Sequence, residues 1–261
     1  MITYPDIDPV ALDMGLVKIH WYGITYVVGI LAAWLLLRYR GKQSHWEFSN
    51  EQISDLIFYA MLGIILGGRL GSVIFYNFSY YIQHPIEIFY LQQGGMSFHG
   101  GLIGVLVAVW FFAHKINKPF FRVTDFIAPV VPVGLGCGRI GNFINGELWG
   151  SPSDLPWAMI FPDPAAGGIA RHPSQLYEVL LEGMLLFIIL WWFSSKPRPM
   201  MAISGLFLLG YGVFRSLVEF VRVPDQHIGY VAFDWLTQGQ LLSLPMIILG
   251  VIWMLMAYRK N

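Results

Sequence analysis

The chain has 261 residues, of which 56% are hydrophobic and 12% charged, and its formal net charge is zero. Soluble globular domains carry roughly 25% charged residues, so this composition indicates a protein embedded in lipid. Zero net charge excludes the basic surface of a nucleic-acid-binding domain, and the single cysteine, Cys137, excludes an internal disulfide. No Cys and His cluster has the spacing of a zinc site, and the N-terminal segment does not resemble a cleaved signal peptide.

Seven stretches are apolar enough to cross a membrane, which requires about 20 residues in a helix. In chain order they are 19–38, 53–76, 97–114, 123–137, 174–193, 202–222 and 238–257. The fourth is short and contains Asp125, Pro129 and Pro132, so we expect a broken or tilted helix there. We predict an all-α integral membrane protein, a bundle of about seven transmembrane helices that forms one polytopic domain over residues 1–261.

Basic residues in the short loops predict how the chain is oriented in the membrane. One side would carry Arg38, Arg40, Lys42, Lys115, Lys118, Arg122, Lys196, Arg198, Arg259 and Lys260, and the other only Lys18, Arg139, Arg171 and Arg222. The richer side is therefore expected to be cytoplasmic, with the N-terminus outside and the C-terminus inside. Segments of about 77–96 and 138–173 would then form a small periplasmic head region, with the chemistry near the outer leaflet.

The sixth apolar stretch contains a stripe of polar side chains. Tyr211, Arg215, Glu219 and Arg222 follow one another at intervals of four, four and three residues. On a helix they share one face within an arc of roughly 80°. Ionisable groups inside a membrane are functional candidates by default. Either Arg215 and Glu219 form a structural ion pair, or the stripe lines a polar cavity.

Other polar residues lie at the ends of the apolar stretches. His99 in "GGMSFHGG" begins the third stretch, and it is either a structural residue or a functional one. Arg69 in "GGRLG" is either a structural ion-pair partner for a nearby carboxylate or a second lipid contact, and we favour the structural interpretation. Tyr22 in "HWYG" lies near the same expected outer boundary as His99. Glu178 in "RHPSQLYE" lies within the membrane boundary and requires a partner.

The segment "GRIGNFINGELWG", residues 138–150, is the densest polar cluster. The planar fork of Arg139 suits phosphate oxygens, and the amides of Asn142 and Asn145 add donors. We interpret the segment as a loop at the headgroup level that binds a lipid phosphate. The alternative is a compact turn whose polar groups satisfy one another.

These motifs, taken together, resemble those of the bacterial prolipoprotein diacylglyceryl transferases. The resemblance covers, in order, "HWYG", "GGRLG", "GGMSFHGGLIG", "GRIGNFINGELWG", "RHPSQLYE", "YGVFRSLVEFVRVPD" and "TQGQLLS". It implies a transferase of the bacterial inner membrane that moves the diacylglyceryl group of phosphatidylglycerol to the lipobox cysteine thiol of a preprolipoprotein. A thioether forms, glycerol phosphate leaves, and lipoprotein maturation begins. The resemblance implies phosphatidylglycerol and lipobox signal peptides as partners. We expect no cofactor, and no metal is required because two guanidiniums would take its place.

The resemblance also assigns residues to roles. The family's essential tyrosine, histidine and arginine fall on Tyr22, His99 and Arg139, and its second arginine falls on Arg215. These four are the expected catalytic residues. The residues expected to bind phosphatidylglycerol are Arg139, Asn142, Glu147, Gly150, Tyr211, Arg215 and Glu219.

The residues suit this chemistry. Arg139 and Arg215 could stabilise the charge that develops on the leaving phosphate. The attacking thiol has an ordinary pKa of about 8.5, so it requires a base, which is either His99 or an arginine-polarised site that favours the thiolate. Two other function classes remain open. A transporter would show two related halves, which are not evident, and an acyltransferase acting through Cys137 would require a histidine and an acid beside that thiol.

Overall fold

The computed structural model describes residues 2–5, 7–15, 17–90, 94–224, 229–233 and 235–259. Contacts group the chain into two compact units. The first unit comprises Met1–Leu36 and Asp125–Asn261, and the second comprises Leu37–Thr124. The single domain expected over residues 1–261 stays a prediction.

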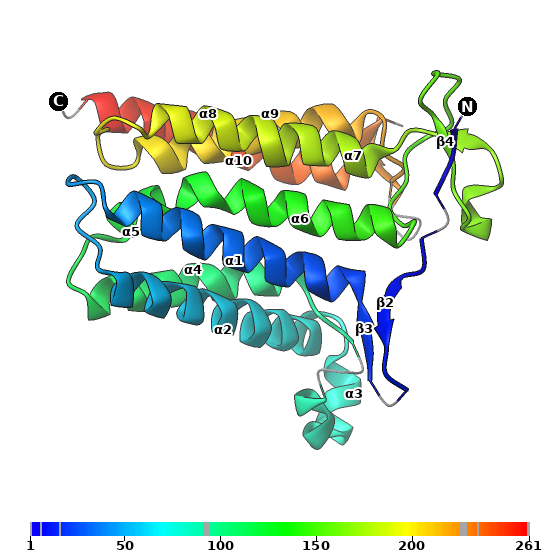
Figure 1. Cartoon of the computed structure of the whole chain (residues 1–261), viewed down its shortest axis with the longest axis horizontal. Helices are drawn as coiled ribbons and strands as arrows, with labels where there is room; N and C mark the ends of the chain where they lie inside the picture. The colour runs from blue at the N-terminus through cyan, green and yellow to red at the C-terminus, as the bar shows by residue number, and fades with distance from the viewer. Residues whose placement is uncertain are drawn as a thin grey trace. The chain divides into compact units, whose positions relative to one another are not determined.

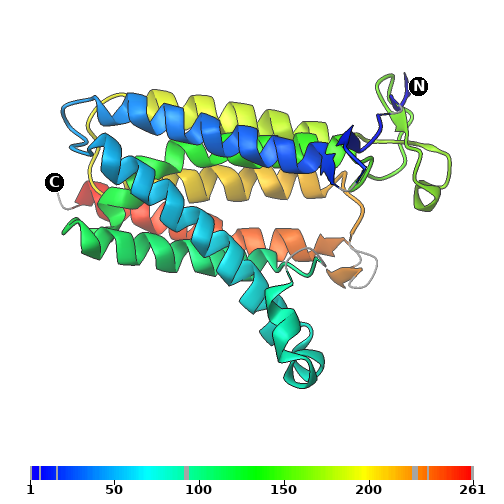
Figure 2. The same ribbon diagram turned by 60° about the horizontal axis from the view of Figure 1, so that its bottom comes forward.

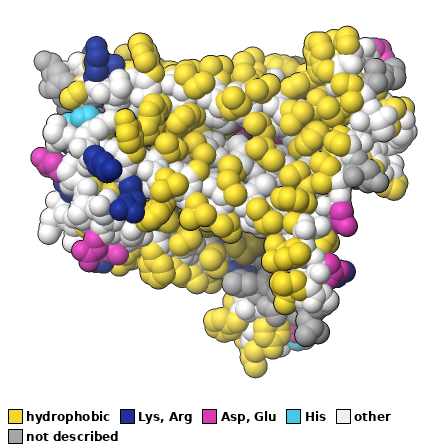
Figure 3. Space-filling model, in the orientation of Figure 1, with side chains coloured by type: hydrophobic (Ala, Val, Ile, Leu, Met, Phe, Trp, Pro, Cys, Tyr) yellow, Lys and Arg dark blue, Asp and Glu magenta, His cyan; other side chains and the backbone are white. Residues whose placement is uncertain are grey.

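The structure is mostly helical, as expected. Among the described residues, seven helical segments have the length and apolar composition to cross a membrane: Trp21–Gly41, Asn50–Phe75, Phe98–Lys115, Phe120–Ile144, Ser174–Phe193, Ala202–Glu219 and Gln238–Arg259. Many large apolar side chains on these helices are exposed, as Leu35, Phe111 and Trp192 illustrate. Figure 3 shows hydrophobic side chains over most of the helix faces in that view. Such exposure suits lipid as the surrounding solvent.

The first unit contains five of these helical segments, which Figure 1 labels. They are α1 (Trp21–Gly41), α6 (Val131–Ile144), the fifth span, α9 (Ala202–Glu219) and α10 (Gln238–Arg259). Figures 1 and 2 show α9 and α10 running side by side, and the two helices contact each other along their length. Asp125 accepts hydrogen bonds from the N–H groups of Met201 and Ser204, which fixes the start of α9.

The fourth span differs from the expectation in length. Helix α5 (Phe120–Ile127) leads through one 3-10 turn, η3 (Ala128–Val130), into α6. Pro132 lies in the first turn of α6, where a missing N–H does not break a helix. Because α6 continues to Ile144, the expected loop over 138–173 is wrong for its first seven residues, 138–144.

Close packing on α1 explains why the first part of the glycine-rich signature, residues 138–144, is helical. A side-chain carbon at Gly141 would lie 2.7 Å from Oγ1 of Thr25 and 2.8 Å from a ring carbon of Tyr22. Small residues allow membrane helices to approach this closely, which offsets the low helix propensity of glycine. The sequence predicted a loop because propensity does not include this contact.

The fifth span is one continuous helix with an irregular centre. Helix α7 (Ser174–Glu178) passes into a π-helical segment, η5 (Val179–Leu185), and then into α8 (Leu186–Phe193). π-Helical turns inside α-helices occur frequently at functional sites. This segment packs against α6, where a carbon added at Gly183 would lie 3.1 Å from the Cα atom of Gly136.

The second unit is built on α2 (Asn50–Phe75) and α4 (Phe98–Lys115). The two helices pack at glycines, since a carbon added at Gly63 or Gly71 would lie less than 3 Å from the α4 backbone. The expected loop over 77–96 contains a short helix, α3 (Phe78–Gln83), and a 3-10 helix, η1 (Pro85–Phe89). That part of the loop expectation is therefore wrong as well.

The chain also contains short strands, and the all-α prediction did not include them. Strands β1 (Ile2–Thr3), β4 (Met159–Ile160) and β5 (Ala170–Arg171) form a three-stranded sheet. Strands β2 (Val10–Asp13) and β3 (Lys18–His20) form a hairpin before α1, and β6 (Tyr230–Ala232) pairs with β7 (Leu236–Thr237). The 3-10 turn η4 (Pro164–Ala166) completes the region that was expected to form a head.

A buried tyrosine joins this sheet to the end of α6. Tyr4 packs against Phe143 and Phe161. Its hydroxyl donates to the carbonyl oxygens of Phe143 and Ile144, at 2.5 and 2.8 Å. The last carbonyls of a helix have no partner within the helix, so Tyr4 closes the terminus that carries the signature.

Candidate active site

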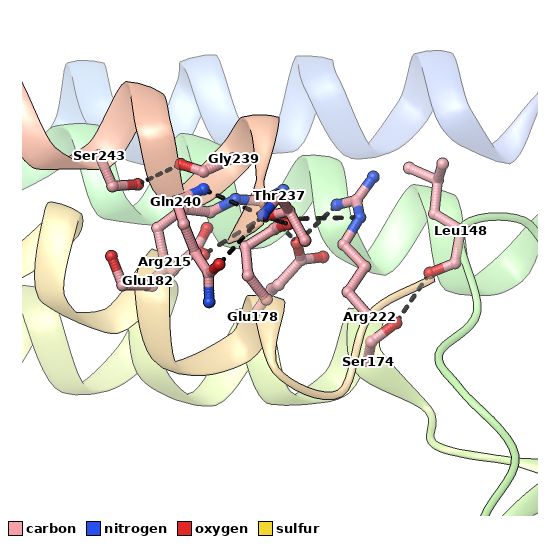
Figure 4. A network of polar contacts seen from close by, with 12 residues as sticks. Leu148, Ser174, Glu178, Glu182, Arg215, Arg222, Thr237, Gly239, Gln240 and Ser243 are labelled. Atoms are coloured by element: carbon pink, nitrogen blue, oxygen red, sulfur yellow. Dashed lines mark hydrogen bonds and ion pairs between the residues drawn. The ribbon is translucent and has the colours of Figure 1, made fainter. Parts of the chain in front are cut away.

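Six ionisable side chains of the first unit form one acid–guanidinium cluster, five of them on three helical segments and the sixth, Arg222, just beyond the end of α9. Its members are Arg139, Glu178, Glu182, Arg215, Glu219 and Arg222. Figure 4 shows Glu178, Arg215 and Arg222 directed toward one another, with Glu182 beside Arg215. The cluster joins α6, the fifth span and the C-terminal part of α9.

Glu178 contacts all three arginines of the cluster. Its side chain is fully buried, and Oε2 lies 3.2 Å from Nε of Arg139. Oε1 accepts a hydrogen bond from Nη1 of Arg222 at 2.9 Å and another from Arg215. The expectation that Glu178 requires a partner is confirmed. Removing one member of a buried ion pair leaves an uncompensated charge, which costs roughly 3–5 kcal/mol.

The second carboxylate, Glu219, holds Arg215 from its own helix. The two residues form an ion pair one turn apart on α9, as the first of the two interpretations of the stripe proposed. The other oxygen of Glu219 accepts a hydrogen bond from Oγ1 of Thr237 at 2.6 Å. Thr237 and Gln240 exchange hydrogen bonds between their side chains and backbone N–H groups, which is the pattern of a capping box. The start of α10 is thus tied to the cluster.

The stripe expected on the sixth span is only partly helical. Tyr211, Arg215 and Glu219 lie on α9, but the helix ends at Glu219. Arg222 lies beyond that end, in a bridge to Gly150, and reaches Glu178 from there. Burial lowers the pKa of the Arg222 guanidinium, and the neighbouring Arg215 lowers it further, while Glu178 opposes both effects.

Arg139 and Asn142 lie one turn apart on α6. Nη1 of Arg139 donates to Oδ1 of Asn142 at 3.4 Å, and Nδ2 of Asn142 donates to Oε1 of Glu147 at 2.8 Å. Asn145 donates to the same Glu147 oxygen at 3.3 Å. The polar groups of the signature therefore satisfy one another in part, as the alternative interpretation expected. The Arg139 side chain nevertheless remains 21% exposed, the largest exposure among the three arginines of the cluster.

The first turn of α7 holds the loop after α6. Nε2 of Gln175 donates to the carbonyl oxygen of Glu147 at 2.6 Å, and the Ser174 hydroxyl donates to that of Leu148 at 2.8 Å. Leu148 has a φ of 60°, a conformation that is uncommon for a non-glycine residue. Ser174 and Gln175 therefore fix the backbone that presents the Glu147 carboxylate to Asn142.

Gly150 occupies a position with no room for a side chain. A carbon added there would lie 2.8 Å from Cβ of His172 and 2.9 Å from its carbonyl oxygen. The Gly150 N–H donates to that same oxygen at 2.8 Å. His172 Nδ1 lies 3.1 Å from the Tyr177 hydroxyl, and burial lowers the pKa of His172.

Tyr22 and Cys137 lie on the contact between α1 and α6. The Tyr22 ring faces Gly141 of the signature, and its hydroxyl lies 3.1 Å from that of Tyr26. The structure thus brings Tyr22 next to the signature helix. Cys137 packs against α1, with its Cβ 3.2 Å from a carbon added at Gly29.

His99 and Arg69 belong to the second unit. His99 is exposed on the first turn of α4, after the N-cap residue Ser97, and its catalytic role stays a prediction. Arg69 is buried and donates to backbone carbonyls, including those of Glu87 at 2.6 Å and Ile88 at 2.7 Å. Arg69 therefore has a structural role, as expected, but its partners are backbone carbonyls and not the carboxylate that the sequence analysis expected.

Sequence reasoning did not assign a role to several members of this site. Glu182, Gln175 and Thr237 were not singled out, although Glu182 interrupts the apolar run "VLLEGML". A lone acid within a span is itself a signal of function. Gln175 and Thr237 act through backbone and carboxylate contacts that have no signature in the sequence.

Comparison with known proteins identifies the family. The model of the prolipoprotein diacylglyceryl transferase family matches residues 9–256. The chain is 58% identical over 261 residues to the phosphatidylglycerol–prolipoprotein diacylglyceryl transferase of Pseudomonas paraeruginosa, covering 100% of this chain and 97% of the relative. It is also 58% identical to the protein of the same name from Methylococcus capsulatus, over 262 residues that cover 100% of this chain and 99% of the relative. The chain therefore belongs to the prolipoprotein diacylglyceryl transferase family.

Proposed function

We propose that this chain transfers the diacylglyceryl group of phosphatidylglycerol to the lipobox cysteine of a preprolipoprotein, the first step of bacterial lipoprotein maturation. The observation that carries the proposal is the acid–guanidinium cluster. In it Arg139 of the signature and Arg215 of α9 share the carboxylate of Glu178. The cluster lies in a chain that matches its transferase relatives over nearly their full length.

The reaction is a displacement at carbon. The substrate thiol gives up its proton, and the sulfur attacks the diacylglycerol carbon that carries the phosphate oxygen. The C–S bond of a thioether forms as that C–O bond breaks, and the bonding electrons leave on glycerol phosphate. A phosphodiester monoanion thereby becomes a monoester that approaches two negative charges.

Arg139 and Arg215 would stabilise the charge that develops on the leaving phosphate. Preorganised donors directed at developing charge usually contribute more to the rate enhancement than any other single effect. Glu178 and Glu219 hold both guanidiniums in place before the lipid arrives, so little reorganisation is required. Asn142 and Glu147 position Arg139 from its own side of the cluster, and Gly150 lets the chain pass closely beside His172.

Tyr22 and His99 complete the proposed catalytic set. The Tyr22 hydroxyl lies next to the signature helix and would contact the lipid headgroup together with Tyr211. His99 would act as the base that accepts the thiol proton, since histidine titrates near pH 6.5. Its exposure on the first turn of α4 leaves its ring accessible to a substrate.

The chain is a multi-pass membrane protein, and we propose its orientation from its basic residues. Arg38 and Arg40 lie in the last turn of α1, and Arg259 lies in the last turn of α10. Under the positive-inside rule these ends face the cytoplasm. The N-terminus and the acid–guanidinium cluster then lie toward the periplasmic side of the cytoplasmic membrane, where exported preprolipoproteins arrive.

Purified protein tests the function directly. With phosphatidylglycerol labelled in its glycerol and acyl groups and a lipobox peptide, we expect equal amounts of thioether-linked diacylglyceryl peptide and glycerol phosphate. Cys137→Ala should retain this activity, because the reacting thiol belongs to the substrate. Loss of transfer in that variant, with the protein still folded, would instead favour the acyltransferase alternative. Lipid movement without transfer would favour a transporter.

The orientation has its own test in whole cells. In a Cys137→Ala background, Asp154→Cys should react with a membrane-impermeant thiol reagent, because the head region faces the periplasm. Ser195→Cys, between α8 and α9, should be protected until the cells are opened. The reverse pattern would invert the topology and leave the transferase activity unaffected.

A further inference from the structure

Glu182 is the one carboxylate of the acid–guanidinium cluster without a hydrogen bond in the part of the chain that the structure describes. Its side chain is only 1% exposed, and neither of its oxygens has a hydrogen-bond partner there. The nearest cationic atom, Nη1 of Arg215, lies 3.8 Å from Oε1, which is beyond the range of an N–H···O hydrogen bond. The other two carboxylates each accept hydrogen bonds.

The surroundings of Glu182 are charged, but no cation is paired with it alone. Arg215 and Tyr211 face it from α9, Arg139 from α6 and Glu178 from its own span, and Arg222 lies beyond the end of α9. Every one of these guanidiniums already contacts Glu178. A buried carboxylate without hydrogen bonds is costly, whereas the neutral acid avoids most of that cost.

A proton on Glu182 changes the net charge of the acid–guanidinium cluster. The three guanidiniums carry three positive charges, and Glu178 and Glu219 carry two negative ones. With Glu182 neutral the cluster has a net charge of +1, and with Glu182 ionised it has none. Glu147 is connected to the cluster only through the Asn142 amide among the described contacts. A net charge of +1 matches the single negative charge of a phosphodiester.

We propose that Glu182 is a positioning residue that holds a proton and so leaves the arginine cluster with one positive charge for the lipid phosphate. This inference rests on the proposed function for its substrate and on the burial and contacts of Glu182 for the proton. Its neutral carboxyl group fills the space beside Arg215 and Tyr211 without drawing Arg215 away from Glu178. Glu182 lies in the π-helical segment η5, where it is buried.

Infrared spectroscopy tests the proton without an activity measurement. Purified wild-type protein should show the carbonyl band of a protonated carboxyl group, shifted in heavy water, and Glu182→Gln should lack that band. If the wild type and Glu182→Gln have the same carboxyl spectrum, Glu182 carries no proton and the proposal is overturned. The proposed function does not affect this result, so the two can fail separately.

Kinetics test the role in transfer, with Glu178 as the matched position. Glu182→Ala should lower the rate of transfer by about tenfold, because it leaves a cavity beside Arg215 and lets that guanidinium shift from Glu178. Glu182→Gln should rescue most of that loss, because it restores a neutral polar side chain of the same size. Glu178→Gln should not rescue Glu178→Ala, because three arginines require that negative charge.

Two kinetic outcomes would overturn the proposal. One is a Glu182→Gln variant as impaired as Glu182→Ala, which would mean that the ionised carboxylate is required. The other is a lower KM for phosphatidylglycerol in Glu182→Gln than in the wild type. Such a decrease would mean that the wild-type carboxylate is ionised, because removing its negative charge strengthens the attraction for the phosphate. If no variant or wild type transfers lipid at all, the proposed function fails and the infrared result still stands.

Discussion

The guanidinium of Arg139 lies 3.2 Å, at Nε, from Oε2 of Glu178, a residue 39 positions later in the chain. The pair joins the signature helix α6 to the fifth span. Because the other oxygen of Glu178 contacts Arg215 and Arg222, one buried carboxylate sets the position of every arginine in the cluster. Substitutions at Arg139 and Arg215 should therefore affect transfer through a shared partner.

Arg139→Lys should lose most of the transfer activity, by about tenfold or more. Arg139 uses Nε on Glu178 and Nη1 on Asn142, and lysine cannot make both contacts and still reach a phosphate. The measurement is the rate of transfer to a lipobox peptide at matched protein levels. Arg198→Lys is the control, because Arg198 donates to the carbonyl of Phe193 away from the cluster. Near-normal turnover of Arg139→Lys would show that transfer does not require the two contacts that the guanidinium makes together.

Arg139→Ala and Arg215→Ala should not be additive. Each alone leaves Glu178 without one of its cations and disrupts the shared phosphate contact, so the double variant should cost much less than the sum. Residues of one ion-pair network typically couple by about 0.5–3 kcal/mol. A double-mutant cycle on the transfer rate measures this coupling. Additive losses would mean that the two arginines act at different steps.

Gly239→Ala should impair both stability and transfer. A carbon added at Gly239 would lie within 2.8 Å of Oε2 of Glu219 and nearer still to its other carboxyl atoms. Glu219 would have to move from Arg215, and such overpacking costs roughly 1–3 kcal/mol. Gly134→Ala on α6 is the matched control, since it meets no atom within 4 Å. The measurements are the thermal unfolding temperature in detergent and the transfer rate. If Gly239→Ala and Gly134→Ala have equal unfolding temperatures and equal rates, the prediction is wrong.

His99→Gln should reduce turnover more than it weakens lipid binding. If His99 accepts the thiol proton, its loss lowers kcat while KM for phosphatidylglycerol changes little. His114→Gln, on the last turn of the same helix α4, is the control. The measurement is the steady-state rate over about pH 6 to pH 9. Full turnover of His99→Gln throughout this range would assign the base elsewhere.

The fold should become less stable as the pH falls below about 6.5, and His172 should contribute to that loss. Burial lowers the pKa of His172 in the folded chain, so the unfolded chain takes up the proton first and is favoured by acid. Above about pH 6.5 both states are neutral there and the effect vanishes. In His172→Gln the unfolding temperature should therefore fall less steeply as the pH is lowered into the acid range.

The same experiment requires a His45 variant as a control, because His45 also has a lowered pKa. Burial, Arg40 and Arg122 lower its pKa too, so His45→Gln should flatten the same slope separately. An acid slope that is identical in the wild type and His172→Gln would show that the His172 ring takes up a proton equally well in the folded state.

The membrane spans, the family and most of the charged site residues could be predicted from the order of residues alone. Apolar runs of about 20 residues specify spanning helices, because a helix satisfies all of its backbone hydrogen bonds within one segment and runs of this length exceed a spanning strand. The spacing of Tyr211, Arg215 and Glu219 specified a shared helix face in the same way. Both signals are local, so they can be read along the chain.

The partners of these residues, in contrast, depend on how distant helices pack. Arg139 lies on a helix, not in a loop, because glycine packing of α6 on α1 outweighs local propensity. Glu178 meets arginines 37 and 44 residues away, and Glu182 lies near Arg215, 33 residues later in the chain. A buried charge takes whichever partner the packed helices bring within reach, and that partner is set by three-dimensional distance and not by sequence spacing.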